Sequence, residues 1–252
     1  MDISIKNNAL ILKFSLLLNL SEEEKKILLS LQSECNSVPP QTDIVIEGED
    51  LPATYIVQSG WTYTYKLLPD GKQQILNFNL CGDIIGPYAM VFKQADHSVR
   101  TVTETELFKV DPEELLELFS QSPRLAAAIF WSSARDGAIL GEQVTRIGRR
   151  PAYERMAHLL LELLRRLESV GLVVDDKYDF PLTQELLADT LGLTPVHVNR
   201  TIRALKKDGL INYESGLMKI INPKGLRKVA DFDPSYLEQT DLPDEIASHL
   251  DP

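Results

Sequence analysis

The sequence predicts an α+β chain with a β-rich first half, one long helix and a C-terminal winged helix-turn-helix. Three observations support this prediction. Short runs rich in β-branched and aromatic residues fill positions 43–110, a helical stretch follows from about 122 to 148, and two short amphipathic helices then flank a glycine. With 252 residues and 44% hydrophobic residues, the chain can bury one large core or two ordinary ones.

The β-rich region contains five strand-like segments, which begin at residues 43, 53, 61, 72 and 98. Each is short and partly alternating, which is typical of half-buried strands. Pro69-Asp70-Gly71 predicts a tight turn between two of them, because Pro and Gly supply the dihedral angles that a turn needs. Strands at this spacing predict a sandwich or a barrel.

A long helix is expected to start near Ser122-Pro123 and to end near Gly148, before a hinge at Arg149-Arg150-Pro151. Alternating steps of three and four residues suggest a dimerisation seam along it, formed by Ile129, Ser133, Asp136, Leu140, Gln143 and Ile147. Gly137 and Gly141 weaken a solitary helix and are easier to explain if another backbone packs closely there. The alternative is an ordinary helix that faces the core.

Residues 183–220 carry the helix-turn-helix pattern. Thr183 is a helix N-cap, Gly192 ends that helix, and Thr194-Pro195 begins the next one. Two short strands around Ser215-Gly216 then predict a hairpin, the wing.

The net charge of −11 is distributed unevenly. Residues 1–148 carry a balance of −8 and residues 231–252 one of −7, whereas residues 149–230 carry +4. The basic segment contains the second helix of the pair, on which Val198, Ile202 and Leu205 share an apolar face. Local charge decides what a surface attracts, so this segment is the expected docking site of an anion.

The order of these parts resembles the Crp/Fnr family of bacterial transcription regulators. The segment "PLTQELLADTLGLTPVHVNRTIRALKKDGLI" carries the strongest resemblance, and "GDIIGPYAM" followed by "HSVRTVTET" resembles the segment of the family's effector pocket. The resemblance implies a cyclic-nucleotide-binding-like β-roll (jelly-roll) as sensor domain at 1–122, a dimerisation helix and hinge at 123–150, and a winged helix-turn-helix DNA-binding domain at 151–230. An acidic C-terminal tail is expected at 231–252.

The resemblance also implies a homodimer on a palindromic double-stranded DNA operator, an unknown small-molecule effector, and contact with RNA polymerase. The residues expected to bind DNA are Thr183, Gln184, Val196, His197, Asn199, Arg200, Arg203 and Lys207. Residues near the start of the second helix reach base edges, so Val196, Asn199 and Arg200 are the predicted readers. Arg203 and Lys207, with Thr183 and Gln184, are expected to meet phosphate, and His197 is either a DNA contact or a solvated surface histidine.

The effector pocket is expected to involve Gly86, Pro87, Tyr88, Arg100 and Leu140. Cyclic-AMP-binding members have a Gly-Glu pair where this chain has Gly86-Pro87, and an Arg-Ser pair about where it has Ala95-Asp96. An anionic phosphate needs a cation or clustered backbone N–H groups, so cyclic AMP is not the expected effector. Either a different small ligand binds, or the pocket has lost its ligand. Tyr88 could line such a pocket or simply pack.

Other classes of function find little support in the sequence. There is no glycine-rich phosphate loop, nucleophile elbow or set of metal ligands, so neither an enzyme, a metal site nor a cofactor is expected. Cys35 and Cys81 are too few for a disulfide framework or a four-cysteine iron–sulfur cluster, which favours a reducing, cytoplasmic compartment. The longest apolar run, "NALILKFSLLLNL", is interrupted by Lys13 and Ser15, so no membrane contact is expected. The rival hypothesis is a ligand-binding regulatory module whose winged helix contacts a protein. The second helix has no aromatic anchor on its exposed face, which favours DNA.

Overall fold

The computed structural model describes residues 8–238, which fall into two compact units. The N-terminal unit includes the described residues up to 62 and residues 79–136. The C-terminal unit contains residues 63–78 and 137–237. The division therefore falls inside the predicted 123–150 segment, and it assigns one β-hairpin of the first half to the C-terminal unit.

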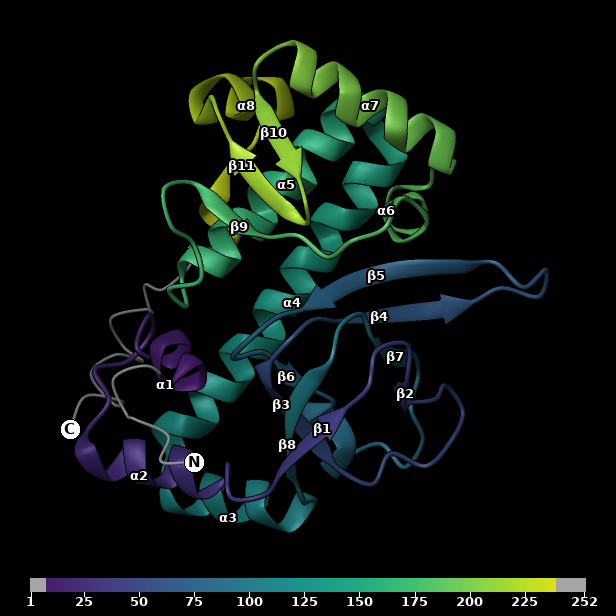
Figure 1. The fold of residues 1–252 in the computed structure, drawn as a ribbon. Coiled ribbons are helices and arrows are strands. Elements are labelled where there is room, and N and C mark those ends of the chain that lie inside the picture. The colour runs from purple at the N-terminus through teal and green to yellow at the C-terminus, as the bar shows by residue number, and fades with distance from the viewer. Residues whose placement is uncertain (1–7, 239–252) are drawn as a thin grey trace. The chain divides into compact units, whose positions relative to one another are not determined.

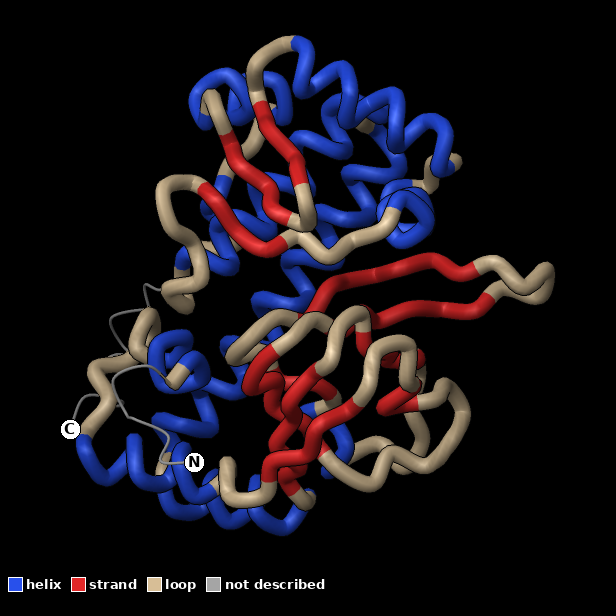
Figure 2. The backbone as a smooth tube through the Cα atoms, in the orientation of Figure 1, coloured by secondary structure: helices blue, strands red, loops and turns tan. Residues whose placement is uncertain are grey.

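The N-terminal unit is built on antiparallel strands (Figures 1 and 2). One sheet has the order β1-β8-β3-β6, formed by β1 (Cys35–Val38), β8 (Thr105–Val110), β3 (Thr54–Ser59) and β6 (Ile84–Ile85). A second antiparallel pair consists of β2 (Asp43–Val45) and β7 (Ser98–Thr101). The predicted strand segments are confirmed, the one at 98–110 divides into β7 and β8, and β1 and β6 were not anticipated.

The strands β3, β6 and β8 of the first sheet bury side chains on both faces, whereas β1 is largely exposed. Consecutive residues of a strand point to opposite sides, so Ile56 joins one apolar cluster and Val57 the other. One cluster lies against helices and the other includes side chains from β2 and β7. The predicted sandwich-like β domain is therefore observed, with a helical layer on its other side.

That helical layer comprises α1 (Ala9–Phe14), α2 (Glu22–Ser30), α3 (Pro112–Gln121) and the first half of α4 (Pro123–Arg149), and η2 (Pro87–Met90) is a short 3-10 helix. The starts of these helices are set locally: Ser21 and Glu24 form a capping box at α2, and the Glu114 side chain accepts from the Asp111 N–H at α3. A buried ion pair between Lys13 and Asp83, at 2.6 Å, ties α1 to the turn before β6.

Helix α4 spans the stretch predicted for the long helix, but the residues of the predicted seam do not share one exposed face: Ser133 and Leu140 are exposed, whereas Ile129 and Gln143 are buried. Ile129 is buried in the N-terminal core, and the amide of Gln143 donates to the carbonyls of Ile75 and Thr190. These two positions therefore face the interior of their own chain. The exposed stripe of α4 consists of Phe130, Ser133, Ala134, Gly137, Leu140, Gly141, Val144, Thr145 and Gly148.

The C-terminal unit contains α5 (Ala152–Glu168), α6 (Gln184–Leu191), α7 (Pro195–Lys207) and α8 (Pro223–Ala230). Its small antiparallel sheet has the order β10-β11-β9, formed by β10 (Ile211–Glu214), β11 (Leu217–Ile220) and β9 (Lys177–Asp179). Strands β4 (Thr62–Leu67) and β5 (Gln73–Asn79) form the hairpin whose turn Pro69-Asp70-Gly71 was predicted. The wing hairpin is confirmed, with positive φ at both Ser215 and Gly216.

The segment after α8 differs from the expected acidic tail. Phe232 and Leu237 are buried, and η3 (Pro234–Tyr236) places the Tyr236 hydroxyl 2.7 Å from the Glu162 carboxylate. Apolar burial outweighs the local negative charge here, so residues 231–237 pack as part of the C-terminal unit. The remaining predicted tail, from 239 to 252, lies outside the described residues.

Among the helices of residues 8–238, none combines the length and the apolar character that a bilayer crossing demands.

Candidate DNA-binding site

Local signals build the helix-turn-helix of the C-terminal unit. The Thr183 hydroxyl accepts from the Leu186 N–H at 3.2 Å and so caps α6. Gly192 ends α6 with φ of 62° and ψ of 42°, a left-handed conformation that glycine adopts without penalty. The Thr194 hydroxyl then caps α7, and Pro195 occupies its first position. All of these predicted caps are confirmed.

The two faces of α7 separate as its periodicity predicts. Val198 and Leu205 are fully buried and Ile202 is nearly so. Val196 and the side chains of His197, Arg200, Arg203 and Lys207 are exposed. Helix α7 is anchored at its end by Asp208, whose carboxylate accepts from the Tyr153 hydroxyl at 2.6 Å. Burial, with this hydrogen bond to the carboxylate, raises the pKa of Tyr153 to about 12.

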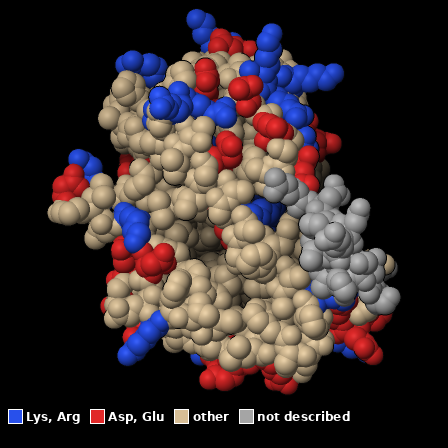
Figure 3. All heavy atoms as spheres, turned by 180° about the vertical axis from the view of Figure 1, so that it is seen from behind, with Lys and Arg blue, Asp and Glu red and all other residues tan. Residues whose placement is uncertain are grey.

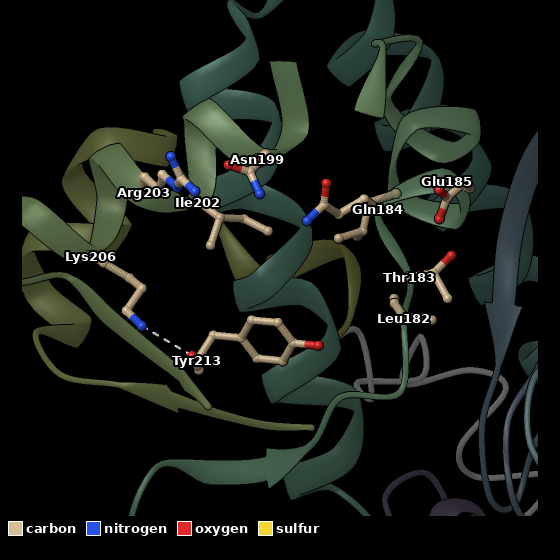
Figure 4. Close-up of a pocket in the computed structure, with 10 residues that line it drawn as sticks. Leu182, Thr183, Gln184, Glu185, Asn199, Ile202, Arg203, Lys206 and Tyr213 are labelled. Carbon is tan, nitrogen blue, oxygen red and sulfur yellow. Dashed lines mark hydrogen bonds between the residues drawn. The ribbon is translucent and has the colours of Figure 1, made fainter. Parts of the chain in front are cut away.

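A pocket of about 600 Å³ lies between the start of α6, the inner flank of α7 and the wing. It gathers Thr183, Gln184, Asn199 and Arg203 from the predicted set, whereas Val196, His197, Arg200 and Lys207 lie outside it. Figure 4 shows the amides of Gln184 and Asn199 pointing toward one another. Exposed Gln184 of α6 and half-buried Asn199 of α7 thus line the same pocket from the two helices of the motif.

Three further polar residues of this pocket, Glu185, Lys206 and Tyr213, were missed by sequence reasoning. Lys206 donates to the Tyr213 carbonyl at 3.1 Å, and the Tyr213 ring extends from the wing into the pocket (Figure 4). Strand alternation in "INYES" places Tyr213 on the same face of β10 as the buried Ile211, which could have indicated that its ring turns toward the domain. Lys206 was hidden by its position one residue before Lys207, on the flank of the helix.

Lys and Arg side chains gather over the C-terminal unit, interspersed with some carboxylates (Figure 3). On α7 the cations are Arg200, Arg203, Lys206 and Lys207, and the N-terminal end of α6 adds backbone N–H groups. Such a surface can hold phosphate oxygens by charge-assisted hydrogen bonds. The planar Arg200 guanidinium can also donate two parallel hydrogen bonds to a guanine.

The predicted effector residues of the N-terminal unit surround a local turn. Gly86 adopts φ of 68° and leads into η2, which Pro87 begins. The Tyr88 hydroxyl lies 2.7 Å from His97 Nε2, and His97 Nδ1 lies 2.7 Å from Asp96. Burial and the Asp96 charge raise the pKa of Tyr88 well above its usual value. Tyr88 also packs against the apolar cluster of this unit, so it is a partly buried member of a Tyr-His-Asp chain.

Arg100 faces Asp43. Its guanidinium donates two hydrogen bonds of 2.7 Å to that carboxylate, from Nε and from an Nη. The carboxylate therefore already occupies the fork that a ligand phosphate would need. Ala95 is buried, and its methyl side chain supplies no cation for a phosphate. Leu140, the remaining predicted residue, belongs to the C-terminal unit, where its side chain is exposed.

Among the described residues, no group of three His, Cys, Asp or Glu side chains is arranged to hold a metal ion. Cys81 donates to the Gln58 carbonyl, and burial raises its pKa to about 11, which disfavours the reactive thiolate.

The fold and the site together define a class of protein: a winged helix-turn-helix DNA-binding domain that follows a cyclic-nucleotide-binding-like β domain. Comparison with known proteins agrees with this class. Residues 35–122 match the cyclic nucleotide-binding domain, and residues 154–229 match the Crp-like helix-turn-helix domain.

Relatives of known function give the family. The chain is 30% identical over 190 residues to the transcriptional activatory protein AadR of Rhodopseudomonas palustris, which covers 73% of this chain and 76% of AadR. It is 31% identical over 172 residues to the nitrogen fixation regulation protein FixK of Azorhizobium caulinodans, or 68% of each chain. The chain belongs to the Crp/Fnr family of transcription regulators.

A solved structure shows the same architecture. The FixK2 structure from Bradyrhizobium japonicum matches with a TM-score of 0.71 at 25% identity, covering 78% of this chain and 96% of FixK2. Members of the family are transcription regulators and not enzymes. The predictions of fold class, family and a non-enzymatic regulator are therefore confirmed.

Proposed function

We propose that this regulator acts as a homodimer that binds a palindromic DNA operator, with one α7 helix in the major groove of each half-site. The observation that carries the proposal is the exposed face of α7. Its apolar residues Val198 and Leu205 are buried, which turns Val196, Arg200 and Arg203 outward. A helix of this kind presents its first turns to base edges and its later cations to the phosphate backbone.

Each predicted contact has a distinct role in the proposed complex. Arg200 reads a guanine, Asn199 pairs with an adenine, and Val196 meets a thymine methyl group. Lys207 and Arg203 neutralise phosphates, as do the capped start of α6 at Thr183 and Gln184. His197 lies on the rim of this surface. The acidic remainder of the chain lowers attraction to random DNA, so one small basic face confers selectivity.

The exposed stripe of α4 supports the homodimer. Phe130 and Val144 are 76% and 64% exposed, and a third apolar residue, Leu140, is also exposed. At Gly137 and Gly141 a Cβ atom would meet no other part of residues 8–238 within 4 Å, apart from the helix itself. Glycine costs a helix about 1 kcal/mol relative to alanine. No contact within the described residues needs a glycine at either position, whereas the close approach of a second α4 helix would need one.

The surroundings of Arg100 support an effector other than cyclic AMP. The Arg100 guanidinium is already paired with the Asp43 carboxylate, and Ala95 carries no charge. Pro87 stands where cyclic-AMP-binding members of the family have a glutamate. The partly buried Tyr88-His97-Asp96 chain offers hydrogen bonds to a ligand without a phosphate. RNA polymerase contact is proposed from the family resemblance alone.

Selection of the operator from random DNA, followed by binding measurements with Arg200→Ala and Lys207→Ala, tests the function. Arg200→Ala should weaken binding by about 1–3 kcal/mol per contact and relax preference at one position in each half-site. Lys207→Ala should weaken binding to all sequences alike and flatten the salt dependence. The proposed reading surface is refuted if Arg200→Ala weakens operator and random DNA by the same factor. A wild-type chain that selects no sequence but retains a protein partner would favour the rival regulatory module.

A further inference from the structure

A buried polar network occupies the junction of α4 and α5 in the C-terminal unit. Arg146 is 1% exposed and lies at its centre. Its guanidinium donates to Glu162 at 2.5 Å and to Gln143 at 2.6 Å, and it approaches His158 Nδ1 at 3.1 Å. Glu162 and His158 are as deeply buried as Arg146. One planar group of α4 is therefore held by two side chains of α5, His158 and Glu162, in a defined relation.

One arm of the network ends on the helix-turn-helix. The Gln143 carbonyl accepts from Arg146, while its amide donates to the Thr190 carbonyl at 2.6 Å. Thr190 lies in the last turn of α6, two residues before the Gly192 turn. The same amide donates to the Ile75 carbonyl of β5 at 3.2 Å. Arg146 is thus separated from α6 by one side chain only.

A second arm ends on residues 231–237, which we call the clasp. The Tyr236 hydroxyl donates at 2.7 Å to the Glu162 oxygen that also accepts from Arg146. The Phe232 ring meets the His158 ring edge-on at a centroid distance of 4.9 Å. The Tyr236 ring is stacked with the same His158 ring, at a centroid distance of 6.2 Å. Arg150, at the end of α4, donates to the Ala230 carbonyl just before the clasp. The clasp therefore closes over the α4–α5 junction.

The chemistry of the network favours a geometric role over a purely stabilising one. A buried ion pair is seldom more stable than apolar side chains of the same volume, because both charges lose their hydration. Its hydrogen bonds are directional, however, and in a low dielectric they tolerate little displacement. A network that joins α4, α5, α6 and the clasp is suited to hold one angle between them.

We propose that the clasp locks the helix-turn-helix in one orientation relative to α4, and that Tyr236 is a positioning residue for DNA recognition. The inference rests on the proposed function, in which two α4 helices pair and carry two α7 helices to the half-sites. In that assembly, the angle between α4 and α6–α7 sets the distance between the two reading surfaces. The clasp thereby determines how strictly the regulator measures half-site spacing.

The test compares Tyr236→Phe with Tyr178→Phe in the full chain. Both substitutions remove one tyrosine hydroxyl that donates a hydrogen bond within the C-terminal unit. Tyr236 is half-buried, whereas Tyr178 is buried and its hydroxyl donates to the Leu160 carbonyl within the α5–β9 packing. Affinity is measured for the selected operator and for operators with one or two base pairs inserted at the centre. Tyr236→Phe should reduce the discrimination against inserted base pairs about fivefold, the equilibrium weight of one hydrogen bond. Tyr178→Phe should retain wild-type discrimination.

Glu162→Gln provides a second variant, because it keeps the shape of the side chain and removes the charge shared by Arg146 and Tyr236. It should relax spacing discrimination further than Tyr236→Phe. Wild-type discrimination in Tyr236→Phe would overturn the inference, and so would an equal loss in Tyr178→Phe. If only the inference is wrong, the wild-type protein still prefers its operator sequence over random DNA. If the wild-type protein shows no such preference, both the proposed function and the inference are wrong.

Discussion

Acidification should destabilise the α4–α5 junction through a single histidine. His158 is 1% exposed, and burial, with the nearby Arg146 and Arg150 charges, lowers its pKa from about 6.5 to about 2. The ring is therefore neutral in the folded chain at any pH near neutrality. Its Nδ1 accepts from Arg146, which a protonated ring could not do.

The magnitude follows from proton linkage. Between pH 2 and 6.5 the unfolded chain binds a proton at His158 that the folded chain does not, so stability rises with pH in this window. Stability should therefore be fully present above about pH 6.5 and should fall below it. Lowering the pH from 7.5 to 5.5 should cost about 1.4 kcal/mol for this one group.

Hydrogen exchange of the α5 amides can measure this local free energy, after correction for the intrinsic chemical rate at each pH. Both tryptophans, Trp61 and Trp131, lie in the N-terminal unit, so their fluorescence would report on the other unit. His158→Gln serves as the comparison, because it cannot take up the proton and should lack this part of the pH dependence. Equal pH dependence in wild type and His158→Gln would refute the reasoning.

The remaining predictions concern assembly and the effector. Leu140→Glu should place two like charges across the proposed α4 pair, so sedimentation should detect monomer and operator binding should collapse. Leu116→Glu alters a leucine on α3 that is exposed as well, 56% against 42% for Leu140, and should leave the dimer intact. An unchanged dimer in Leu140→Glu would move the interface elsewhere. Calorimetry with cyclic AMP should detect no tight binding, because Asp43 holds the Arg100 fork. A micromolar dissociation constant would contradict that expectation and make Arg100 the first residue to replace.

The helix-turn-helix was predictable because its determinants are local. Thr183, Gly192 and Thr194 act on backbone groups within a few residues of themselves, so caps and turn can be read from spacing alone. The inward face of α7 followed from the same short-range periodicity. The family resemblance rested on this stretch, which explains why the fold class and the regulator function were predicted correctly.

Contacts distant in sequence were not predictable in the same way. A repeat of three and four residues shows that a helix has a stripe, but the neighbours decide which stripe is buried. Packing against β5 and α6 draws Gln143 inward, so the exposed stripe of α4 contains Gly137 and Gly141 and not Gln143.

The same distinction applies to charge. The sequence by itself determined the long helix, the helix-turn-helix, most strands and the basic face of α7, because these depend on neighbours along the chain. Only the tertiary structure decided that Arg100 pairs with Asp43, and that Arg146 and Tyr236 both donate to one carboxylate oxygen of Glu162. Composition marked residues 231–252 as an acidic tail, yet Tyr236 is held by a carboxylate more than seventy positions earlier. Long-range partners of this kind are selected by three-dimensional packing, which leaves no periodic signal in the sequence.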